Sequence, residues 1–249
     1  MILEVRFMFG AENKLRGKTI IWNGDSICAG SAVTGCWANR IAAGNDMAYK
    51  NYAIGGGTIA EDAPRRINGD VRHSVSATLE RMYEEYPDAD YVIFEGGSND
   101  ADLLGIALTD PSATRLGGFD PIDYRGDYDR TTFCGALESV FYRAIKYWQG
   151  KKIGFIVAQK MADADIDIYH NRRFYFDKAV EICVKWGIPY LDLWHGCYLN
   201  PALPWMHDKT KDWKENKEQN NGFYSDGPHL TARGDDVPAD MIDSWLKTL

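Results

Sequence analysis

The sequence predicts an α/β fold in which a parallel β-sheet is covered by helices on both faces. Short apolar runs rich in β-branched and aromatic residues indicate buried strands, and stretches with apolar residues at helical spacing lie between them. Strands that alternate with helices form parallel sheets through right-handed crossovers. These two observations together favour helices on both sides of one sheet.

Five strands are expected, each bounded by residues that favour turns. They are, in order, Lys18–Trp22, Met47–Tyr52, Tyr91–Phe94, Lys152–Val157 and Ile188–Leu193. The first three run into Asn-Gly-Asp, a group of three glycines and Glu-Gly-Gly-Ser, which are turn sequences. Pro189 lies within the last run, and proline, which has no backbone N–H, favours an edge strand.

Five helices are expected between and after these strands. They are, in order, Trp37–Ala43, Ser74–Tyr86, Thr131–Trp148, Tyr169–Trp186 and Thr231–Leu249. The second carries apolar residues three and four positions apart, and Pro87 ends it. Thr131 or Thr132 suits the N-cap of the third, and Gly187 suits the C-terminal cap of the fourth.

The chain length predicts one sizeable domain. Its 249 residues are 45% hydrophobic, which is enough for a single core, with two small domains as the alternative. Residues 1–17 are expected to form a lead-in, as an edge strand or a packed arm, and residues 18–249 the single domain. Two stretches, near 101–130 and 195–225, have no clear helix or strand pattern and are expected to be loop insertions.

Charge and cysteine content exclude several classes of function. A net charge of -8 argues against a nucleic-acid partner and against attraction to an anionic membrane. The five cysteines are odd in number and show no CxxC spacing, so reduced thiols are expected rather than disulfides or a zinc site. The N-terminus is too short and too charged for a signal peptide, so a cytoplasmic protein is expected, with secretion as the alternative.

Ser26 is the candidate nucleophile. It follows the first strand directly, at the carboxyl end where open α/β sheets place their ligands. A serine hydroxyl needs a base, and His229 is the candidate, with Asp226 three residues earlier to orient its ring. The alternative for Ser26 alone is an ordinary turn or helix-cap serine.

An oxyanion formed by attack of Ser26 needs hydrogen-bond donors. The backbone N–H groups of Ser26 and Gly56 and the side-chain amide of Asn99 are the candidates, since all three follow predicted strands. Glycine lets the backbone approach closely, and asparagine is a neutral donor. No HExxH-type pair accompanies the histidines, so no metal is expected.

Four short blocks in the chain resemble those of the SGNH hydrolases, the GDSL esterase and lipase superfamily. They are Gly24-Asp25-Ser26-Ile27, Asn51 to Thr58, Gly97-Ser98-Asn99-Asp100 and Asp226-Gly227-Pro228-His229-Leu230. The resemblance implies a flavodoxin-like three-layer αβα sandwich with strand order 2-1-3-4-5. It also implies ester hydrolysis without metal or cofactor, and it selects Gly56 as the oxyanion glycine, with Gly55 and Gly57 one residue away.

The sequence therefore predicts a serine esterase that cleaves short acyl groups, acetyl above all, through an acyl-enzyme. The substrate is expected to be a small-molecule or oligosaccharide ester, because acidic chains with aromatic loops occur among carbohydrate deacetylases of the family. Two alternatives stay open at this point. One is an acyltransferase with the same triad, and the other is a catalytically silent glycan-binding module.

Overall fold

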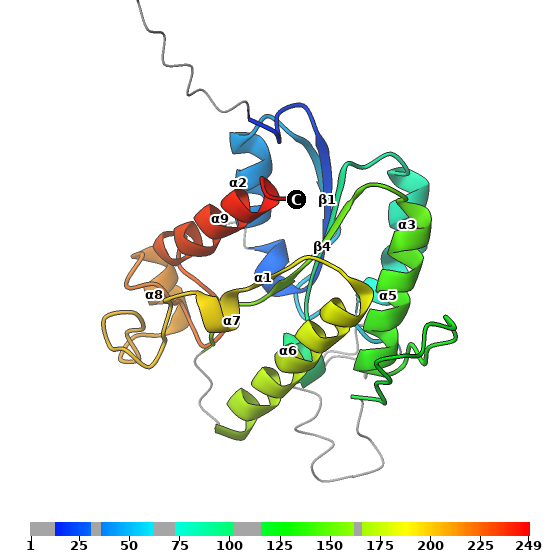
Figure 1. The fold of residues 1–249 in the computed structure, drawn as a ribbon. Coiled ribbons are helices and arrows are strands. Elements are labelled where there is room, and N and C mark those ends of the chain that lie inside the picture. Colours follow the sequence, from blue (N-terminus) through cyan, green and yellow to red (C-terminus); the bar gives the residue numbers. More distant parts are fainter. Residues whose placement is uncertain (1–12, 31–35, 62–72, 102–115, 162–165) are drawn as a thin grey trace, which may run out of the picture.

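The computed structural model describes residues 13–30, 36–61, 73–101, 116–161 and 166–249, and these contain a five-stranded parallel sheet (Figure 1). The strands are β1 (Thr19–Asn23), β2 (Ala48–Asn51), β3 (Tyr91–Glu95), β4 (Lys152–Val157) and β5 (Tyr190–Asp192). Their order is β2-β1-β3-β4-β5, and each neighbouring pair is parallel. The predicted order is confirmed, and Pro189 does precede an edge strand.

Two helical layers cover the sheet. On one face lie α2 (Trp37–Gly44) and α9 (Ala232–Leu246), and on the other α3 (Val75–Glu85), α5 (Phe133–Tyr147) and α6 (Ile166–Trp186), as Figure 1 shows. Side-chain oxygens cap three of these helices at Ser74, Thr132 and Thr231. All five predicted helices are therefore present, and the three-layer sandwich is confirmed.

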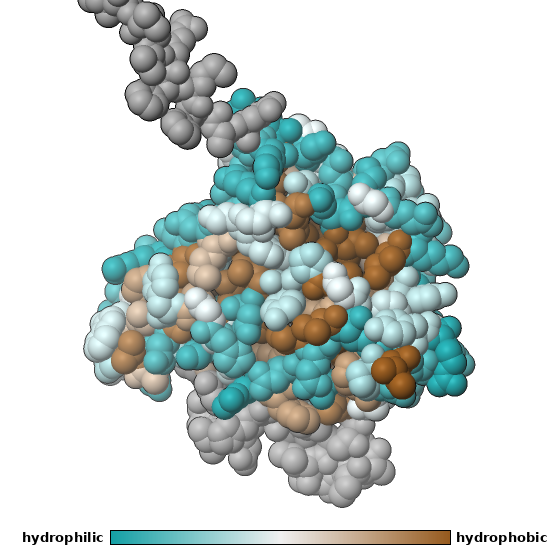
Figure 2. Space-filling model, in the orientation of Figure 1, coloured by the Kyte–Doolittle hydropathy of each residue, from teal (hydrophilic) through white to brown (hydrophobic). Residues whose placement is uncertain are grey.

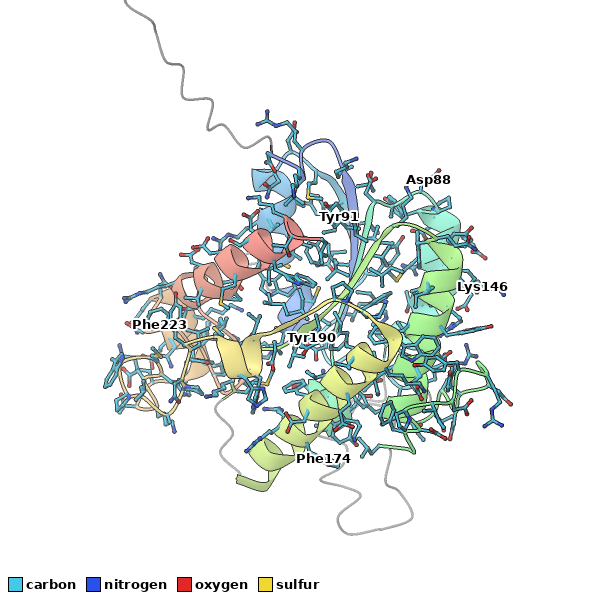
Figure 3. The ribbon with its side chains drawn as sticks, viewed as in Figure 1. Asp88, Tyr91, Lys146, Phe174, Tyr190 and Phe223 are labelled. Carbon is cyan, nitrogen blue, oxygen red and sulfur yellow. The ribbon has the colours of Figure 1, made fainter. Side chains whose placement is uncertain are left out.

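The pleat of the strands divides the core into two halves. In β3, Val92 and Phe94 join the cluster under α3, α5 and α6, whereas Tyr91 and Ile93 join the cluster under α2 and α9. This alternation is expected for a strand buried on both faces. Figure 3 shows side chains filling the space on both sides of the sheet. All five cysteines are buried free thiols, as predicted.

Three short helices that lie wholly within the described residues were not predicted. They are α1 (Ser26–Ala29), α7 (Leu193–Gly196) and α8 (Trp213–Glu218). The last corrects the expectation that 195–225 is loop throughout: Asp212 accepts hydrogen bonds from the amides of Lys214 and Glu215, and a capping box starts the helix. A helix of six residues is too short to show a periodic pattern in sequence.

The other predicted irregular segments are described only in part. In the predicted lead-in, residues 1–12 lie outside the described residues, but Leu15 is fully buried in the core under α2 and α9. In the predicted insertion at 101–130, residues 102–115 lie outside them, and residues 116–130 form turns and bends. On the face shown in Figure 2, apolar residues emerge in small groups among polar ones. No described helix is long and apolar enough to cross a membrane.

Candidate active site

Ser26 is the first residue of α1, just past the carboxyl end of β1, which lies between β2 and β3 in the sheet. Asp25 caps this short helix, because its Oδ1 accepts the Ile27 amide at 2.8 Å. Ser26 is partly exposed, and its backbone N–H donates to no residue in the described ranges. A side chain at this position is held by the turn while its oxygen stays accessible.

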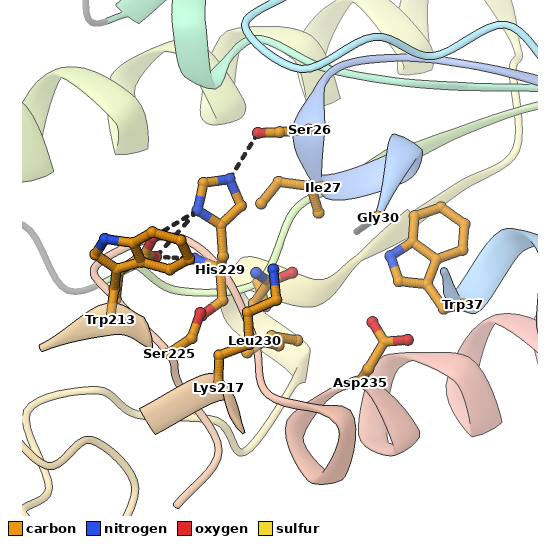
Figure 4. A pocket seen from close by; sticks show the side chains of 12 residues that line it. Ser26, Ile27, Gly30, Trp37, Trp213, Lys217, Ser225, His229, Leu230 and Asp235 are labelled. Carbon is orange, nitrogen blue, oxygen red and sulfur yellow. Dashed lines mark hydrogen bonds and ion pairs between the residues drawn. The ribbon is translucent and has the colours of Figure 1, made fainter. Parts of the chain in front are cut away.

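His229 approaches Ser26 from a tight turn that precedes α9. Its Nε2 lies 2.8 Å from Ser26 Oγ, although the two residues are 203 positions apart in the chain (Figure 4). On the other side of the ring, Nδ1 lies 2.8 Å from Asp226 Oδ2. The backbone N–H of His229 also donates to Asp226 Oδ1 at 2.7 Å, so the carboxylate fixes both the ring and the turn. A neutral ring with its proton on Nδ1 then presents an unprotonated Nε2 to the hydroxyl.

Asp226 is ionised over a wide pH range. Burial raises the pKa of its carboxyl, but the hydrogen bonds and charge of His229 outweigh burial, and the resulting pKa lies below the ordinary value. A carboxylate at this place favours the Nδ1–H tautomer and would stabilise an imidazolium.

The Asp-x-x-His spacing occurs at three other places in the chain, one of which is Asp192 and His195. Asp192 Oδ1 accepts the His195 amide at 3.0 Å, and His195 Nδ1 lies 2.8 Å from Asp192 Oδ2. The Nε2 atom of this ring lies 3.7 Å from Asp177. Of these two pairs, the one at 226 and 229 faces Ser26, and the one at 192 and 195 is a natural control for it.

The predicted oxyanion donors lie beside the serine turn. A Cβ added to Gly55 would lie 3.7 Å from Ser26 Cβ, and Gly56 has a φ of 75°, which favours glycine. Asn99 lies in a helical segment that begins at residue 98, just after β3. Its Nδ2 donates to the Gly57 carbonyl at 2.9 Å and to Asp25 Oδ2 at 3.1 Å. The amide therefore has two acceptors within the protein, and an oxyanion would share one of its hydrogens.

Comparison with solved structures extends over nearly the whole chain. A Lactobacillus plantarum protein matches with a TM-score of 0.68 and 22% identity, over 94% of this chain and 98% of that one. A lipase/acylhydrolase from Enterococcus faecalis matches with a TM-score of 0.55 and 18% identity, over 93% and 96%. A carbohydrate acetylesterase from Sinorhizobium meliloti matches with a TM-score of 0.60 and 13% identity, over 93% and 99%. The chain has the fold of the SGNH hydrolases.

The assignment of the fold depends on the structure, because the sequence searches found no relatives. No protein-family model matches the chain, and no curated protein matches it in sequence. The SGNH hydrolase fold is instead evident from the parallel sheet in the order 2-1-3-4-5 and from the solved structures that share it.

A cavity of about 330 Å³ opens beside the His229 ring (Figure 4). Ile27, Trp37 and Leu230 supply apolar walls, Lys217 extends into it from α8, and Trp213 lies at its edge. Lys217 forms no ion pair with the described residues, and its Nζ lies 5.8 Å from the centre of the Trp213 ring. A ligand in the cavity would therefore meet the ammonium group and the indole together.

Gln159 also lines the cavity and was not predicted from the sequence. It is fully buried after β4, its Nε2 donates to the Pro228 carbonyl at 3.0 Å, and its Oε1 has no hydrogen-bond partner among the described residues. Within the same residues, no group of three or more His, Cys, Asp or Glu side chains is placed to hold a metal ion.

Asp235, in the first turn of α9, lines the far wall of the cavity and predicts a pH-dependent contribution to stability. Burial raises the pKa of this carboxyl to about 7, against the opposing charge of Arg40, whose Nη1 lies 3.4 Å away. Between about pH 4 and 7 the folded chain keeps a proton here that the unfolded chain has lost, so stability falls as the pH rises through that window.

Asp235→Asn is expected to remove this loss. Between about pH 5 and pH 8, the free energy of unfolding measured in urea should fall less in the variant than in the wild type, by about 3 kcal/mol. Asp240→Asn, an exposed position on the same helix, is the control and should follow the wild type. Identical pH dependence in Asp235→Asn and the wild type would contradict the assignment.

Proposed function

We propose that the protein is a serine esterase that hydrolyses short-chain acyl esters, acetyl esters above all, and that its alcohol substrate is a carbohydrate. The observation that carries the proposal is the chain of hydrogen bonds from Asp226 through His229 to Ser26. These residues lie at the carboxyl edge of the parallel sheet and line a cavity. Serine, histidine and aspartate in this order form the relay that activates a hydroxyl for acyl transfer.

The reaction proceeds in two steps. His229 Nε2 takes the proton of Ser26 Oγ as that oxygen bonds to the ester carbonyl carbon, and the carbonyl oxygen becomes an oxyanion. Collapse of this intermediate breaks the bond to the alcohol oxygen, which leaves with the proton from His229. Water then attacks the acyl-enzyme, again losing its proton to His229, and the acid departs while Ser26 regains a proton.

Asn99→Ala tests the oxyanion site. The amide stabilises charge that develops only in the transition state, so its loss is expected to lower kcat about 10²–10³-fold with little change in KM. Asn39→Ala, on α2 away from the serine turn, is the control. A decrease in kcat below about threefold would remove Asn99 from this role.

The cavity supports a polar alcohol as the leaving group. His229 must protonate the departing oxygen, so the alcohol part lies within hydrogen-bond reach of Nε2, where the cavity opens. Lys217 can donate to hydroxyl groups, and the indole of Trp213 suits the C–H face of a sugar ring. A carbohydrate acetylesterase shares the fold, which agrees with this reading of the cavity.

Trp213→Ala tests the carbohydrate side. The indole is 57% exposed, so its removal should leave the fold unchanged. We expect KM for acetylated xylo-oligosaccharides to rise about three- to tenfold, and KM for vinyl acetate, with its two-carbon alcohol part, to stay unchanged. Trp205→Ala is the matched control, because Trp205 is 67% exposed and does not line the cavity. Equal KM values for the sugar ester in both variants would argue against stacking on Trp213.

One substrate panel tests the proposed function as a whole. Initial rates would be measured on acetylated mono- and oligosaccharides and on p-nitrophenyl esters from acetate to longer acyl chains. The proposal expects kcat/KM to fall as the acyl chain lengthens and to be highest for a sugar acetate. Turnover that appears only when an acceptor alcohol is present would indicate an acyltransferase, and no turnover of any ester would indicate a binding module.

A further inference from the structure

Two buried carboxyl groups meet directly behind Ser26. Glu95 is the last residue of β3 and Asp25 precedes the nucleophile, and their exposed fractions are 0% and 1%. The Asp25 amide donates to Glu95 Oε2 at 3.2 Å. A Cβ at Gly24 would lie 2.7 Å from the same Oε2, so only glycine lets the acid approach the turn this closely. The esterase mechanism assigns neither carboxyl a role.

The hydrogen bonds around the pair favour a proton on Glu95 and a charge on Asp25. Both oxygens of Asp25 accept N–H groups, Oδ1 from Ile27 and Oδ2 from Asn99, as an ionised carboxylate does. Glu95 Oε1 is buried and accepts no hydrogen bond from any described residue. A buried carboxylate oxygen without a donor is costly, whereas a protonated one can donate to the neighbouring acid.

The direction of the pKa shifts agrees with this assignment. Burial raises the pKa of both carboxyls, and that of Glu95 lies well above its ordinary range. The interaction between the two side chains lowers the pKa of Asp25 and raises that of Glu95, which is the pattern expected when an acid donates to a carboxylate.

The pair is connected to the oxyanion site through Asn99. Asp25 Oδ2 lies 3.1 Å from Asn99 Nδ2, and the Gly57 carbonyl is the second acceptor of that amide. The position of Asp25 therefore decides where the amide hydrogens point. An oxyanion donor is effective only when it is held in place before the reaction begins.

We propose that Glu95 is a positioning residue that donates its carboxyl proton to Asp25, so that Asp25 holds the Asn99 amide where it can reach the oxyanion. This inference rests on the proposed esterase function. It predicts that catalysis requires a neutral hydrogen-bond donor at position 95 and does not require a negative charge there.

Two substitutions of similar volume separate the donor from the charge. Glu95→Gln keeps an N–H for Asp25 and an oxygen for the Asp25 amide, so its kcat for p-nitrophenyl acetate should stay within about threefold of the wild type. Glu95→Met has no donor and should lower kcat by about 10–10²-fold with KM nearly unchanged. Equal losses in both variants would overturn the proposal, because the charge would then be the required feature.

A double-mutant cycle tests the connection to Asn99. If Glu95 acts through that amide, Glu95→Met should cost nothing further once Asn99 is alanine, and the double variant should match Asn99→Ala within about twofold. Independent effects would instead multiply. Glu138→Met is the matched control: Glu138 is a buried glutamate on α5 that pairs with Lys185, and its loss should lower stability without changing kcat.

An infrared measurement separates failure of this inference from failure of the esterase proposal. At neutral pH the difference spectrum between the wild type and Glu95→Gln should contain the C=O stretch of a protonated carboxyl, whether or not any ester is hydrolysed. Asp235 contributes to both spectra and cancels. Absence of the band from the difference spectrum would overturn the inference by itself. A band without esterase activity would instead reject the proposed function and leave the protonated acid in place.

Discussion

Replacement of Ser26 by alanine is expected to lower kcat for p-nitrophenyl acetate by about 10⁴-fold or more. Removal of Oγ eliminates the bond that the acyl group forms with the enzyme, so only the slow direct attack of water remains. The side chain is partly exposed, and the hydroxyl contacts the His229 ring at 2.8 Å. The fold should therefore survive, with a circular dichroism spectrum and melting temperature close to those of the wild type.

The control for this result is Ser74, a serine with a structural role. Ser74 caps α3 by accepting the Ala77 amide at 3.2 Å, so Ser74→Ala should lower the free energy of unfolding by about 1 kcal/mol and leave kcat unchanged. Full activity in Ser26→Ala would contradict the assignment of the nucleophile, and so would an equal loss of activity in Ser74→Ala.

Asp226→Asn is expected to lower kcat by about 10⁴-fold, the second of the two largest effects. The asparagine oxygen can still accept the His229 backbone N–H, but its NH₂ group would then face Nδ1. That contact favours a ring with its proton on Nε2, which can no longer take the proton of Ser26. The loss should appear in both kcat and kcat/KM, because the substrate is still bound.

Asp192→Asn is the matched control, since Asp192 makes the same two hydrogen bonds to His195. This variant should keep the activity of the wild type, because the His195 ring does not face Ser26. An effect of Asp226→Asn no larger than that of Asp192→Asn would show that the carboxylate at 226 only stabilises its turn.

Much of the fold could be predicted because its determinants are local. Val92 and Phe94 on one face of β3 and Tyr91 and Ile93 on the other form a continuous apolar run, which is the pattern of a strand covered on both sides. The short helices were missed for the opposite reason. Four residues of α1 and six of α8 span little more than one turn each, so their caps rather than their periodicity decide that they are helical.

The candidate site was predictable only in the residues that turn sequences mark. Ser26, Asn99 and His229 each lie within a recognisable block, and the structure brings the first and last into contact, while their catalytic roles stay predictions. The spacing of Asp226 and His229 occurs at three other places in the chain, so spacing alone could not single out this pair. The 2.8 Å contact between His229 and Ser26 does so.

Other residues of the site depend on neighbours that the sequence does not place side by side. Glu95 meets Asp25 because β3 pairs with β1, although the two residues are 70 positions apart. Gln159 and Lys217 share one cavity although one follows a strand and the other lies on α8. Nothing in the local pattern of either residue indicates that it lines a cavity.

Reaction with a fluorophosphonate, followed by mass spectrometry, tests the central claim most directly. This reagent phosphonylates a serine only when a base has activated its hydroxyl. We predict a single adduct, located by peptide sequencing on Ser26, that is absent from Ser26→Ala and forms much more slowly in Asp226→Asn. An unmodified wild type, or an adduct on another serine, would contradict the account.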